Sequence, residues 1–496
     1  MKIPFYKPSI GAEEINEVVD TLRSGWLTTG PKTKLFEREF AEYLNHRHAV
    51  AVNSCTAALH LALEAIGLKA GQSVIVPTMT FAATAEVVRY FGARPILADC
   101  RAEDFNLDVA DADRKIQSAL AAGQSVAAMM PVHYGGQIGD VAGVRSLARR
   151  HNLKIVEDAA HCCPAYYKDS GQSSVVSRQS STPISHLPSP ISHLPADGGE
   201  HRTGSVDASA QLSILGASLF PFRADNNQPS TINQQTTSIN PQPSTLNLLK
   251  NGWLPVGSSA DISCYSFYAN KTITTGEGGM ACTANDDYAD RMRIMSLHGI
   301  SRDAWKRYTA EGSWYYEIIA PGFKYNMADI AAALGLQQLR KAELFHRRRI
   351  ELAGQYRDRL NEVEEIVLPQ VRPDRIHSWH LYVIRLRLDR LNIDRAQFIE
   401  ELTRRGVGAS VHWMPLHAHP YYRETYGYAP EDLPVAWSLY PEIITLPLYP
   451  SMTEGDVDYV CDSIKDIVSR NSRALAGSAI GEGADGNTRG RVCSQP

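Results

Sequence analysis

The chain has 496 residues and a formal net charge of −4; 44% of its residues are hydrophobic and 21% are charged, as expected for a globular enzyme of more than one domain. The small net charge and the lack of a long basic run argue against nucleic acid and anionic membranes as partners. The first residues have no signal-peptide pattern, and no apolar stretch is long enough to span a bilayer. The eight scattered cysteines predict neither a metal site nor a disulfide framework. We therefore expect a cytoplasmic protein.

Residues 1–169 alternate between two patterns. Apolar residues recur at helical spacing in EEINEVVDTL and KLFEREFAEYL, whereas short continuous apolar runs occur in HAVAVN, SVIVPT, RPILAD, SVAAMMPV and KIVEDA. Short apolar runs separated by helices predict a mostly parallel sheet with both faces covered. This is an α/β fold, in which ligands bind at the carboxyl ends of the strands. We assign the segment to the first part of a large domain.

Residues 170–252 depart from this pattern. They are rich in Ser, Pro, Gln, Asn and Thr and contain short repeats: PISHLPS is followed by PISHLPA, and QPSTIN returns as QPSTLN. A segment with so few large apolar residues gains little from burial to offset the entropy of ordering. We interpret it as a disordered insertion in a surface loop; a binding repeat is the alternative.

The α/β pattern resumes after the insertion. Residues 253–362 contain the strand pattern SADISCYSF and a helical stretch near 325–362, and we assign them to the second part of the large domain. In residues 363–470, IHSWHLYVIRLRL is typical of a strand, RAQFIEELTRRG of a helix capped by Gly406, and EGDVDYVCDSIKDIVSR of a final helix. These elements predict a smaller α+β domain. The Gly- and Ala-rich residues 471–496 are expected to be a flexible tail.

The first candidate functional segment is NSCTAALHLALEAIG, residues 53–67. A strand leads into a polar turn and a helix, with Ser54 as a candidate N-cap. The small residues Cys55 and Thr56 would let a ligand approach the first backbone N–H groups, which favours a phosphate site. Capped helix starts are common, so this segment alone is weak evidence.

The second candidate segment is KIVEDAAH, residues 154–161, in which a strand ends on two acids. Asp158 would lie at the rim where α/β folds bind ligands, and a carboxylate there can keep the ring nitrogen of a pyridine cofactor protonated. It is equally suited to be a helix N-cap. His161 would reach a phenolic oxygen of such a cofactor or be a core histidine.

The third candidate segment is SFYANKTITTGEGG, residues 266–279. Lys271 lies between a strand and a Thr/Gly-rich turn, and a lysine in a partly desolvated site has a lowered pKa and can form a Schiff base with an aldehyde. Ser266 would offer a hydroxyl to a phosphate. A solvated surface lysine is the ordinary alternative. Together, the three segments meet the needs of pyridoxal 5'-phosphate (PLP).

The sequence resembles the DegT/DnrJ/EryC1/StrS family of PLP-dependent sugar aminotransferases. The matching stretches are SGWLTTGPKTKLFEREFAEY, NSCTAALHLAL, VPTMTFAATA, PVHYGGQIGD, VEDAAHCCPAYYKD, SFYANKTITTGEGGM, LHGISRDAW, GFKYNMADIAAALGLQQL and HWMPLHAHPYYRE. They cover nearly everything from residue 3 to about 470 outside the insertion. The resemblance implies a fold-type I PLP-dependent transferase with a smaller C-terminal domain.

The resemblance also implies roles for matching residues. Lys271 would bind the cofactor covalently and shuttle the proton, Asp158 would pair with the pyridine nitrogen, and His161 would lie near the phenolic oxygen. Cys55, Thr56 and Ser266 would bind the phosphate, and Asn326 would contact the phosphate bound by a neighbouring subunit. Phe81 would stack on the ring face unless it is a core residue. The residues expected on the substrate side are Trp26, Thr28, Thr29, His298 and His417.

By the same resemblance, the chain would transfer an amino group, usually from glutamate, to a nucleotide-linked keto-sugar in polysaccharide or glycoconjugate biosynthesis, as a homodimer with shared active sites. The departure from the family is the insertion, which separates YYKD from VGS and leaves the flanking motifs intact. Two alternatives stay open. Related sugar dehydratases have histidine in place of the lysine, which Lys271 argues against, and a non-catalytic sensor or scaffold would use the insertion as an interaction segment.

Overall fold

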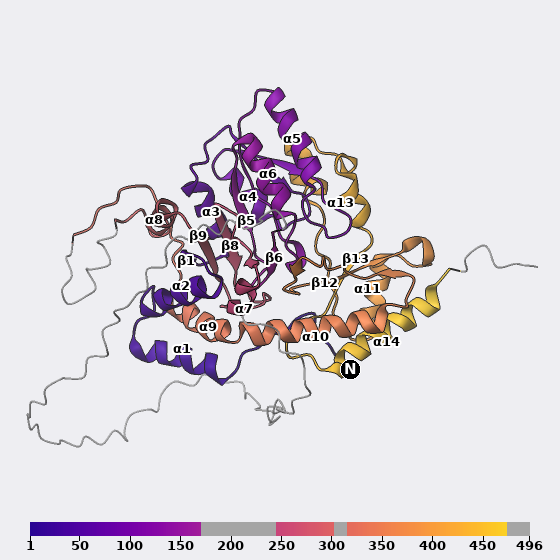
Figure 1. Cartoon of the computed structure of the whole chain (residues 1–496). Coiled ribbons are helices and arrows are strands. Elements are labelled where there is room, and N and C mark those ends of the chain that lie inside the picture. The colour runs from indigo at the N-terminus through magenta and orange to yellow at the C-terminus, as the bar shows by residue number, and fades with distance from the viewer. Residues whose placement is uncertain (170–244, 302–314, 474–496) are drawn as a thin grey trace, which may run out of the picture. The chain divides into compact units, whose positions relative to one another are not determined.

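The computed structural model describes residues 1–169, 245–301 and 315–473, which belong to one compact unit (Figure 1). Its centre is a seven-stranded sheet in the order β1-β9-β8-β5-β4-β2-β3. The strands are β1 (His48–Val52), β2 (Ser73–Pro77), β3 (Arg94–Ala98), β4 (Val126–Met129), β5 (Lys154–Asp158), β8 (Ile262–Ser266) and β9 (Gly279–Thr283).

The sheet is mostly parallel, as the sequence predicts. Strands β3, β2, β4, β5 and β8 pair in parallel, and only β9 runs against its two neighbours, β8 and β1. Every residue of β2, β8 and β9 is buried, which matches their continuous apolar runs. The carboxyl ends of β1, β5 and β8 therefore meet at one edge of the sheet.

Helices cover both faces of this sheet (Figure 1). One face packs against α3 (Cys55–Ala65), α4 (Ala83–Arg89) and α8 (Asp286–Met295) through a core that includes Val74 and Val76. The other face, to which Ile75 points, packs against α2 (Pro31–Tyr43), α5 (Val109–Ala121), α6 (Val141–His151) and α9 (Asp329–Arg340). Helix α1 (Ala12–Ser24) packs on α9. The alternation of Val74, Ile75 and Val76 between two cores is what a strand covered on both faces requires.

A second, three-stranded antiparallel sheet lies in the C-terminal part of the chain, in the order β10 (Ile366–Val367), β12 (Tyr382–Leu386) and β13 (Ile443–Leu446). Its core is shared with α10 (Ala342–Leu360), α11 (Arg395–Arg404) and α14 (Glu454–Asn471). The short helices α12 (Pro420–Tyr426) and α13 (Pro434–Leu439) connect α11 to β13. The expected division into a large and a small domain stays a prediction.

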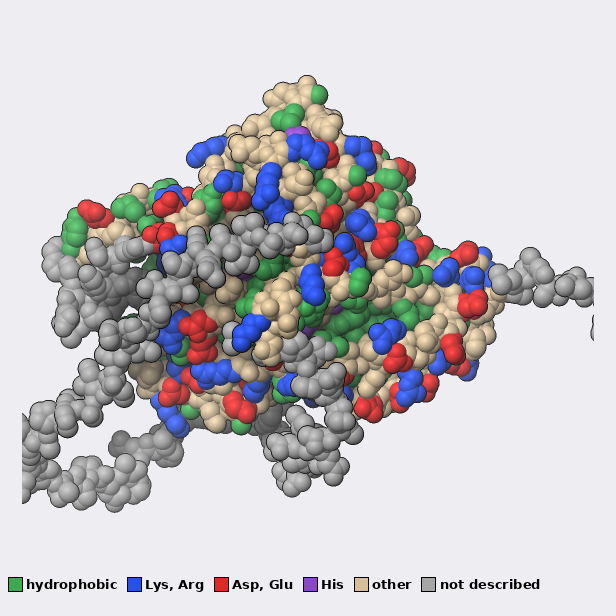
Figure 2. Space-filling model, in the orientation of Figure 1, with side chains coloured by type: hydrophobic (Ala, Val, Ile, Leu, Met, Phe, Trp, Pro, Cys, Tyr) green, Lys and Arg blue, Asp and Glu red, His purple; other side chains and the backbone are tan. Residues whose placement is uncertain are grey.

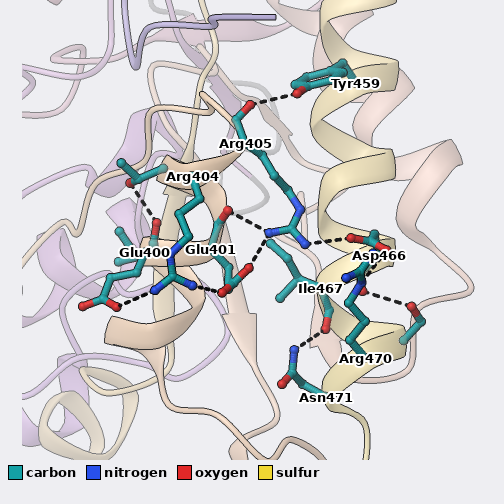
Figure 3. A network of polar contacts seen from close by, with 12 residues as sticks. Glu400, Glu401, Arg404, Arg405, Tyr459, Asp466, Ile467, Arg470 and Asn471 are labelled. Atoms are coloured by element: carbon teal, nitrogen blue, oxygen red, sulfur yellow. Dashed lines mark hydrogen bonds and ion pairs between the residues drawn. The ribbon is translucent and has the colours of Figure 1, made fainter.

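A polar network joins α11 to α14 (Figure 3). The Arg405 guanidinium contacts Glu401 on α11 at 2.5 Å and Asp466 on α14 at 2.7 Å, and the hydroxyl of Tyr459 donates to the Arg405 carbonyl at 2.8 Å. Gly406 follows with a positive φ of 74°, a conformation that ends a helix and suits glycine. The helix predicted over RAQFIEELTRRG and its Gly406 cap are therefore confirmed.

The predicted strand IHSWHLYVIRLRL is only partly correct. Strand β11 (Arg375–Ile376) and strand β12 are separated by a segment in which Trp379 has a positive φ of 53°. The backbone of this segment bonds to a glycine pair instead of a sheet: Ser378 N–H donates to the Gly136 carbonyl and Leu381 N–H to that of Gly135, both at 3.0 Å. A Cβ on Gly136 would lie 2.2 Å from Ser378 Oγ, so this close approach requires glycine.

The two ends of the predicted insertion lie beside each other. Strand β6 (Tyr166–Lys168) pairs antiparallel with β7 (Trp253–Pro255), so Lys168 is opposite Trp253. The insertion was predicted over residues 170–252; residues 170–244 lie outside the described residues, and Thr245–Lys250 form helix α7. The predicted tail also lies outside them from residue 474 onward.

The surface carries charges of both signs. On the face that Figure 2 shows, Lys and Arg side chains are interspersed with Asp and Glu side chains. Among the helices of residues 1–169, 245–301 and 315–473, none is long and apolar enough to cross a membrane.

Candidate active site

The three predicted segments meet at the carboxyl edge of the central sheet. Asp158 is the last residue of β5 and Ser266 the last residue of β8, which pairs with β5 in parallel. Cys55 and Thr56 begin α3, three residues after β1 ends. The parallel strands therefore bring together residues more than 200 positions apart, at the edge where α/β folds bind ligands.

The start of α3 offers a set of backbone donors. Ser54 caps the helix, because its Oγ accepts the Ala57 N–H at 3.1 Å. The N–H groups of Cys55 and Thr56 have no intrahelical partner at this position, and the helix dipole favours an anion there. Gly279 packs so closely that a Cβ would lie 2.5 Å from the Ser54 carbonyl carbon. With Ser266 on the neighbouring strand, this turn can hold a phosphate.

Asp158 is a buried carboxylate with a precise orientation. Thr84 Oγ1 donates to Asp158 Oδ2 at 2.8 Å, and the Ala160 N–H donates to Oδ1 at 3.1 Å. Burial raises the pKa of Asp158, although these two donors, Lys271 and His133 oppose the rise. No helix begins here, so the N-cap alternative is wrong. A carboxylate that is held in place, and whose pKa burial still raises, gains from a nearby positive charge. It is therefore suited to a protonated ring nitrogen.

Lys271 lies in a turn that follows β8, closed by its own N–H, which donates to the Tyr268 carbonyl at 2.9 Å. Burial lowers the pKa of the Lys271 amine to about 8, with Cys55 and Asp158 opposing the change. Because only the neutral amine attacks a carbonyl carbon, this shift makes Lys271 a far better nucleophile near neutral pH than a surface lysine. The side chain is also partly buried, which contradicts the surface-lysine alternative.

His161 is buried, and its hydrogen bonds select one tautomer. The Gly135 N–H donates to Nδ1 at 3.1 Å, so the neutral ring carries its proton on Nε2 and can donate from there. Burial holds the pKa of His161 well below its usual value, and the nearby Lys271, His412 and His377 add to the effect. A neutral imidazole with a donor Nε2–H suits an anionic phenolic oxygen.

Two side chains that the sequence patterns did not single out pack against the His161 ring. The Trp413 ring stacks on it at 5.2 Å between centroids, and the His380 ring packs at 4.3 Å. His412, beside Trp413, is also close to Lys271, since burial and Lys271 together lower the pKa of His412 to about 4. His412 and Trp413 stand in the HWMPLHAH motif. Their position in a matching motif was the signal that could have identified them.

Five other predicted residues gather elsewhere. A cavity of about 750 Å³ opens at the free edge of β1, where Val50 and Ala51 line it. Asn326 Nδ2 donates to Thr29 Oγ1 at 2.6 Å, and the Trp26 indole donates to the Thr29 carbonyl at 3.1 Å. The predicted residues that line this cavity are Trp26, Thr28, Thr29, His298 and Asn326. Asn326 also bridges to Val52, so the cavity adjoins the end of β1.

His417 and Phe81 fit the predictions less well. Both ring nitrogens of His417 are bonded inside the protein, to Thr78 Oγ1 at 2.7 Å and to the Pro430 carbonyl at 2.8 Å, and the side chain is fully buried. The structure therefore does not support a substrate contact for His417. Phe81, three residues before Thr84, is 62% exposed, so it is not a core residue, and its contact with a ring face stays a prediction.

These residues fit PLP by their chemistry. The start of α3 and Ser266 offer donors to a phosphate, Asp158 offers a buried carboxylate to a ring nitrogen, and Lys271 offers an amine of lowered pKa to an aldehyde. His161 offers an N–H to the ring oxygen. Each polar group of the cofactor has a complementary side chain or backbone group at this one edge of the sheet.

The chain is similar to known aminotransferases in sequence and in fold. The family model described as "DegT/DnrJ/EryC1/StrS aminotransferase family" matches residues 8–187 and 251–465. The spore coat polysaccharide biosynthesis protein SpsC of Bacillus subtilis is 36% identical over 467 residues, 94% of this chain and 97% of its own length. Among solved structures, Streptococcus pneumoniae Spr1654 in its PLP form is 27% identical with a TM-score of 0.71, covering 95% of this chain and 99% of that one. The sugar aminotransferase CalS13 of Micromonospora echinospora shares the fold, with 22% identity, a TM-score of 0.68 and coverage of 94% and 99%.

Proposed function

We propose that this chain, which belongs to the DegT/DnrJ/EryC1/StrS aminotransferase family, moves an amino group from glutamate to a nucleotide-linked keto-sugar and acts as a homodimer. The family establishes the reaction class, transamination, and the cofactor, PLP. The donor, the acceptor, the assembly and the residue roles are the proposal. The observation that carries it is the partly buried Lys271, whose amine has a pKa lowered to about 8 at the same sheet edge as Asp158.

Each residue has a task in this reaction. When bound, PLP supplies an electron sink and carries the amino group between the two substrates. Lys271 binds the cofactor and moves the proton that leaves the Cα atom of the amino donor. Asp158, oriented by Thr84, holds a proton on the ring nitrogen, and His161 donates from Nε2 to the ring oxygen. Cys55, Thr56 and Ser266 bind the phosphate.

The two alternatives are less well supported. A dehydratase of this family would have histidine in place of the lysine, whereas this chain has Lys271. A non-catalytic scaffold would have no need for a partly buried lysine of lowered pKa or for the buried carboxylate near it, since both carry a desolvation cost. Perturbed pKa values of this kind are typical of functional sites.

The homodimer is proposed from the position of the cavity at the edge of β1. Its lining residues include Trp26, Thr29 and Asn326 but neither Lys271 nor Asp158. A twofold axis that places this edge over the cofactor site of a second copy would complete both sites at once. In that arrangement Asn326 contacts the phosphate bound by the partner subunit, and Phe81 is covered.

The acceptor is proposed from the cavity and from the relatives. The cavity is large enough for a nucleotide-linked sugar, and Lys34, Arg293 and Lys324 line it, which favours a ligand with a diphosphate. SpsC is named for polysaccharide biosynthesis. We place the reaction in the synthesis of a polysaccharide or glycoconjugate, where an amino sugar is made before its transfer.

The test is a substrate panel. The holoenzyme is supplied with glutamate and with dTDP- and UDP-linked 4-keto and 3-keto sugars, and release of 2-oxoglutarate is measured. We expect turnover with at least one nucleotide sugar and none in Lys271→Ala, which serves as the control. If no nucleotide sugar reacts while pyruvate or oxaloacetate is aminated efficiently, the acceptor proposal is wrong and the transaminase assignment stands.

A further inference from the structure

Arg349 is a buried arginine that pairs with no carboxylate among the described residues. It lies on α10, is 4% exposed, and its Nη1 donates to the carbonyls of Trp379 at 3.1 Å and Leu448 at 2.8 Å. Its Nε is buried and has no hydrogen-bond partner among the described residues. A buried cation is costly unless its donors are satisfied, so the free Nε–H requires an acceptor.

The free Nε–H belongs to a residue that lines a cavity behind the turn of Lys271. Ser9, Asn270 and Lys271 line the same cavity, which offers about 10 Å³ to the centres of water-sized molecules, close to the room that one water needs. Asn270 Oδ1 and Ser9 Oγ are also buried and without partners in the described part of the chain. Three residues from distant segments of the chain therefore line one small cavity, and each has a buried polar atom without a partner among the described residues.

The three atoms are complementary to a single water. Arg349 Nε can only donate, Asn270 Oδ1 can only accept, and Ser9 Oγ can do either. A water accepts one bond and donates two in this arrangement, and buried waters typically make about three hydrogen bonds. We propose that this cavity holds an ordered water that accepts from Arg349 Nε and donates to Asn270 Oδ1 and Ser9 Oγ, and that Arg349 positions Lys271 through it.

This arrangement makes Arg349 a positioning residue for both sides of the cofactor site. Through the water it holds Asn270, the residue before Lys271. Through Nη1 it holds the Trp379 carbonyl, next to His380, whose ring packs on His161. The inference rests on the transamination that the family establishes and not on the proposed acceptor, so it survives if the nucleotide-sugar proposal fails.

The first test is a high-resolution crystal structure of the holoenzyme. We expect an ordered solvent atom within about 3.2 Å of Arg349 Nε, Asn270 Oδ1 and Ser9 Oγ. A cavity without ordered solvent, or a direct bond from Arg349 Nε to a protein atom, would overturn the proposal.

The second test removes one acceptor from the water. In the Asn270→Ala holoenzyme we expect the pH midpoint of the cofactor's visible absorption to shift by about 0.5 unit or more. We also expect kcat to fall roughly tenfold while KM for glutamate changes less than about threefold. A lower melting temperature with an unchanged midpoint and unchanged kcat would mean a structural role only, which contradicts the proposal.

Two further variants make the result specific. Arg349→Lys keeps the charge and the apolar stem but loses the planar donor fork, so it should shift the midpoint in the same direction as Asn270→Ala. Lys7→Gln changes a residue that lines the same cavity but has no buried unpartnered atom, and it should leave both readouts at wild-type values. An equal shift in Lys7→Gln would contradict the proposed water.

Discussion

The hydroxyl of Thr84 donates a 2.8 Å hydrogen bond to Oδ2 of Asp158, which joins the start of α4 to the end of β5. Both side chains are buried. The bond fixes the carboxylate and lowers its pKa against the opposing effect of burial. Thr84 therefore orients Asp158 and opposes the rise in its pKa that burial causes.

Replacing Thr84 with Val should lower kcat about tenfold without unfolding the protein, because Val keeps the shape but removes a hydrogen bond to a charged group. Thr84→Ser keeps the hydroxyl and is the matched control. Steady-state kinetics and circular dichroism measure the two effects.

Asp158→Asn should lose more activity than Thr84→Val, since the asparagine amide cannot hold the ring nitrogen protonated. Near wild-type kinetics in Asp158→Asn would contradict the role assigned to Asp158.

The Lys271 amine should make the stability of the cofactor-free protein depend on pH. The folded-state pKa of about 8 lies below the ordinary lysine pKa of 10.5, so between these values the unfolded chain binds more protons than the folded one. The free energy of unfolding should therefore rise with pH from about 8 to 10.5, by up to about 3 kcal/mol. Denaturant unfolding of wild type and Lys271→Met tests this. A parallel pH dependence in the two proteins would show that Lys271 is not desolvated.

Mixing Asn326→Ala with Lys271→Ala protein should restore activity if the sites are shared across a homodimer. In a heterodimer, one site combines the intact Lys271 of one subunit with the intact Asn326 of the other. After free exchange of equal amounts, half of the dimers are heterodimers, so about one quarter of all sites should be wild type. Mass spectrometry of labelled subunits confirms the exchange. No gain in activity after confirmed exchange would place both residues at the same site in one chain.

Residues 170–244 should be replaceable by a short Gly/Ser linker. Pairing of β6 with β7 places Lys168 opposite Trp253, so the linker joins neighbouring ends, and the cost of loop closure changes only slowly with length. We expect the bound cofactor to remain and the melting temperature to change by less than about 5 °C. Loss of soluble protein would show that the replaced residues belong to the core.

Local sequence patterns predicted most strands of the central sheet and selected Asp158 and Lys271 as candidate site residues. Apolar runs predicted the strands β1 to β5 because a strand covered on both faces is mostly apolar along its length. Asp158 and Lys271 stand beside such runs, so their place at the carboxyl edge of the sheet followed from the strands themselves. The resemblance to a family added the roles that spacing alone could not supply.

Only the tertiary structure decided which side chains meet. His380 reaches His161 because the segment around Ser378 bonds to Gly135 and Gly136 instead of continuing a strand. Trp413 reaches the same ring from another distant segment of the chain. His417, in the same motif, points inward and is fully bonded. The pKa of Lys271 likewise depends on burial by distant parts of the chain. Local sequence sets the backbone preference of each segment. Which side chains touch, and how far each is desolvated, depends on packing between segments that are far apart in the chain, and the pattern of one segment does not contain that information.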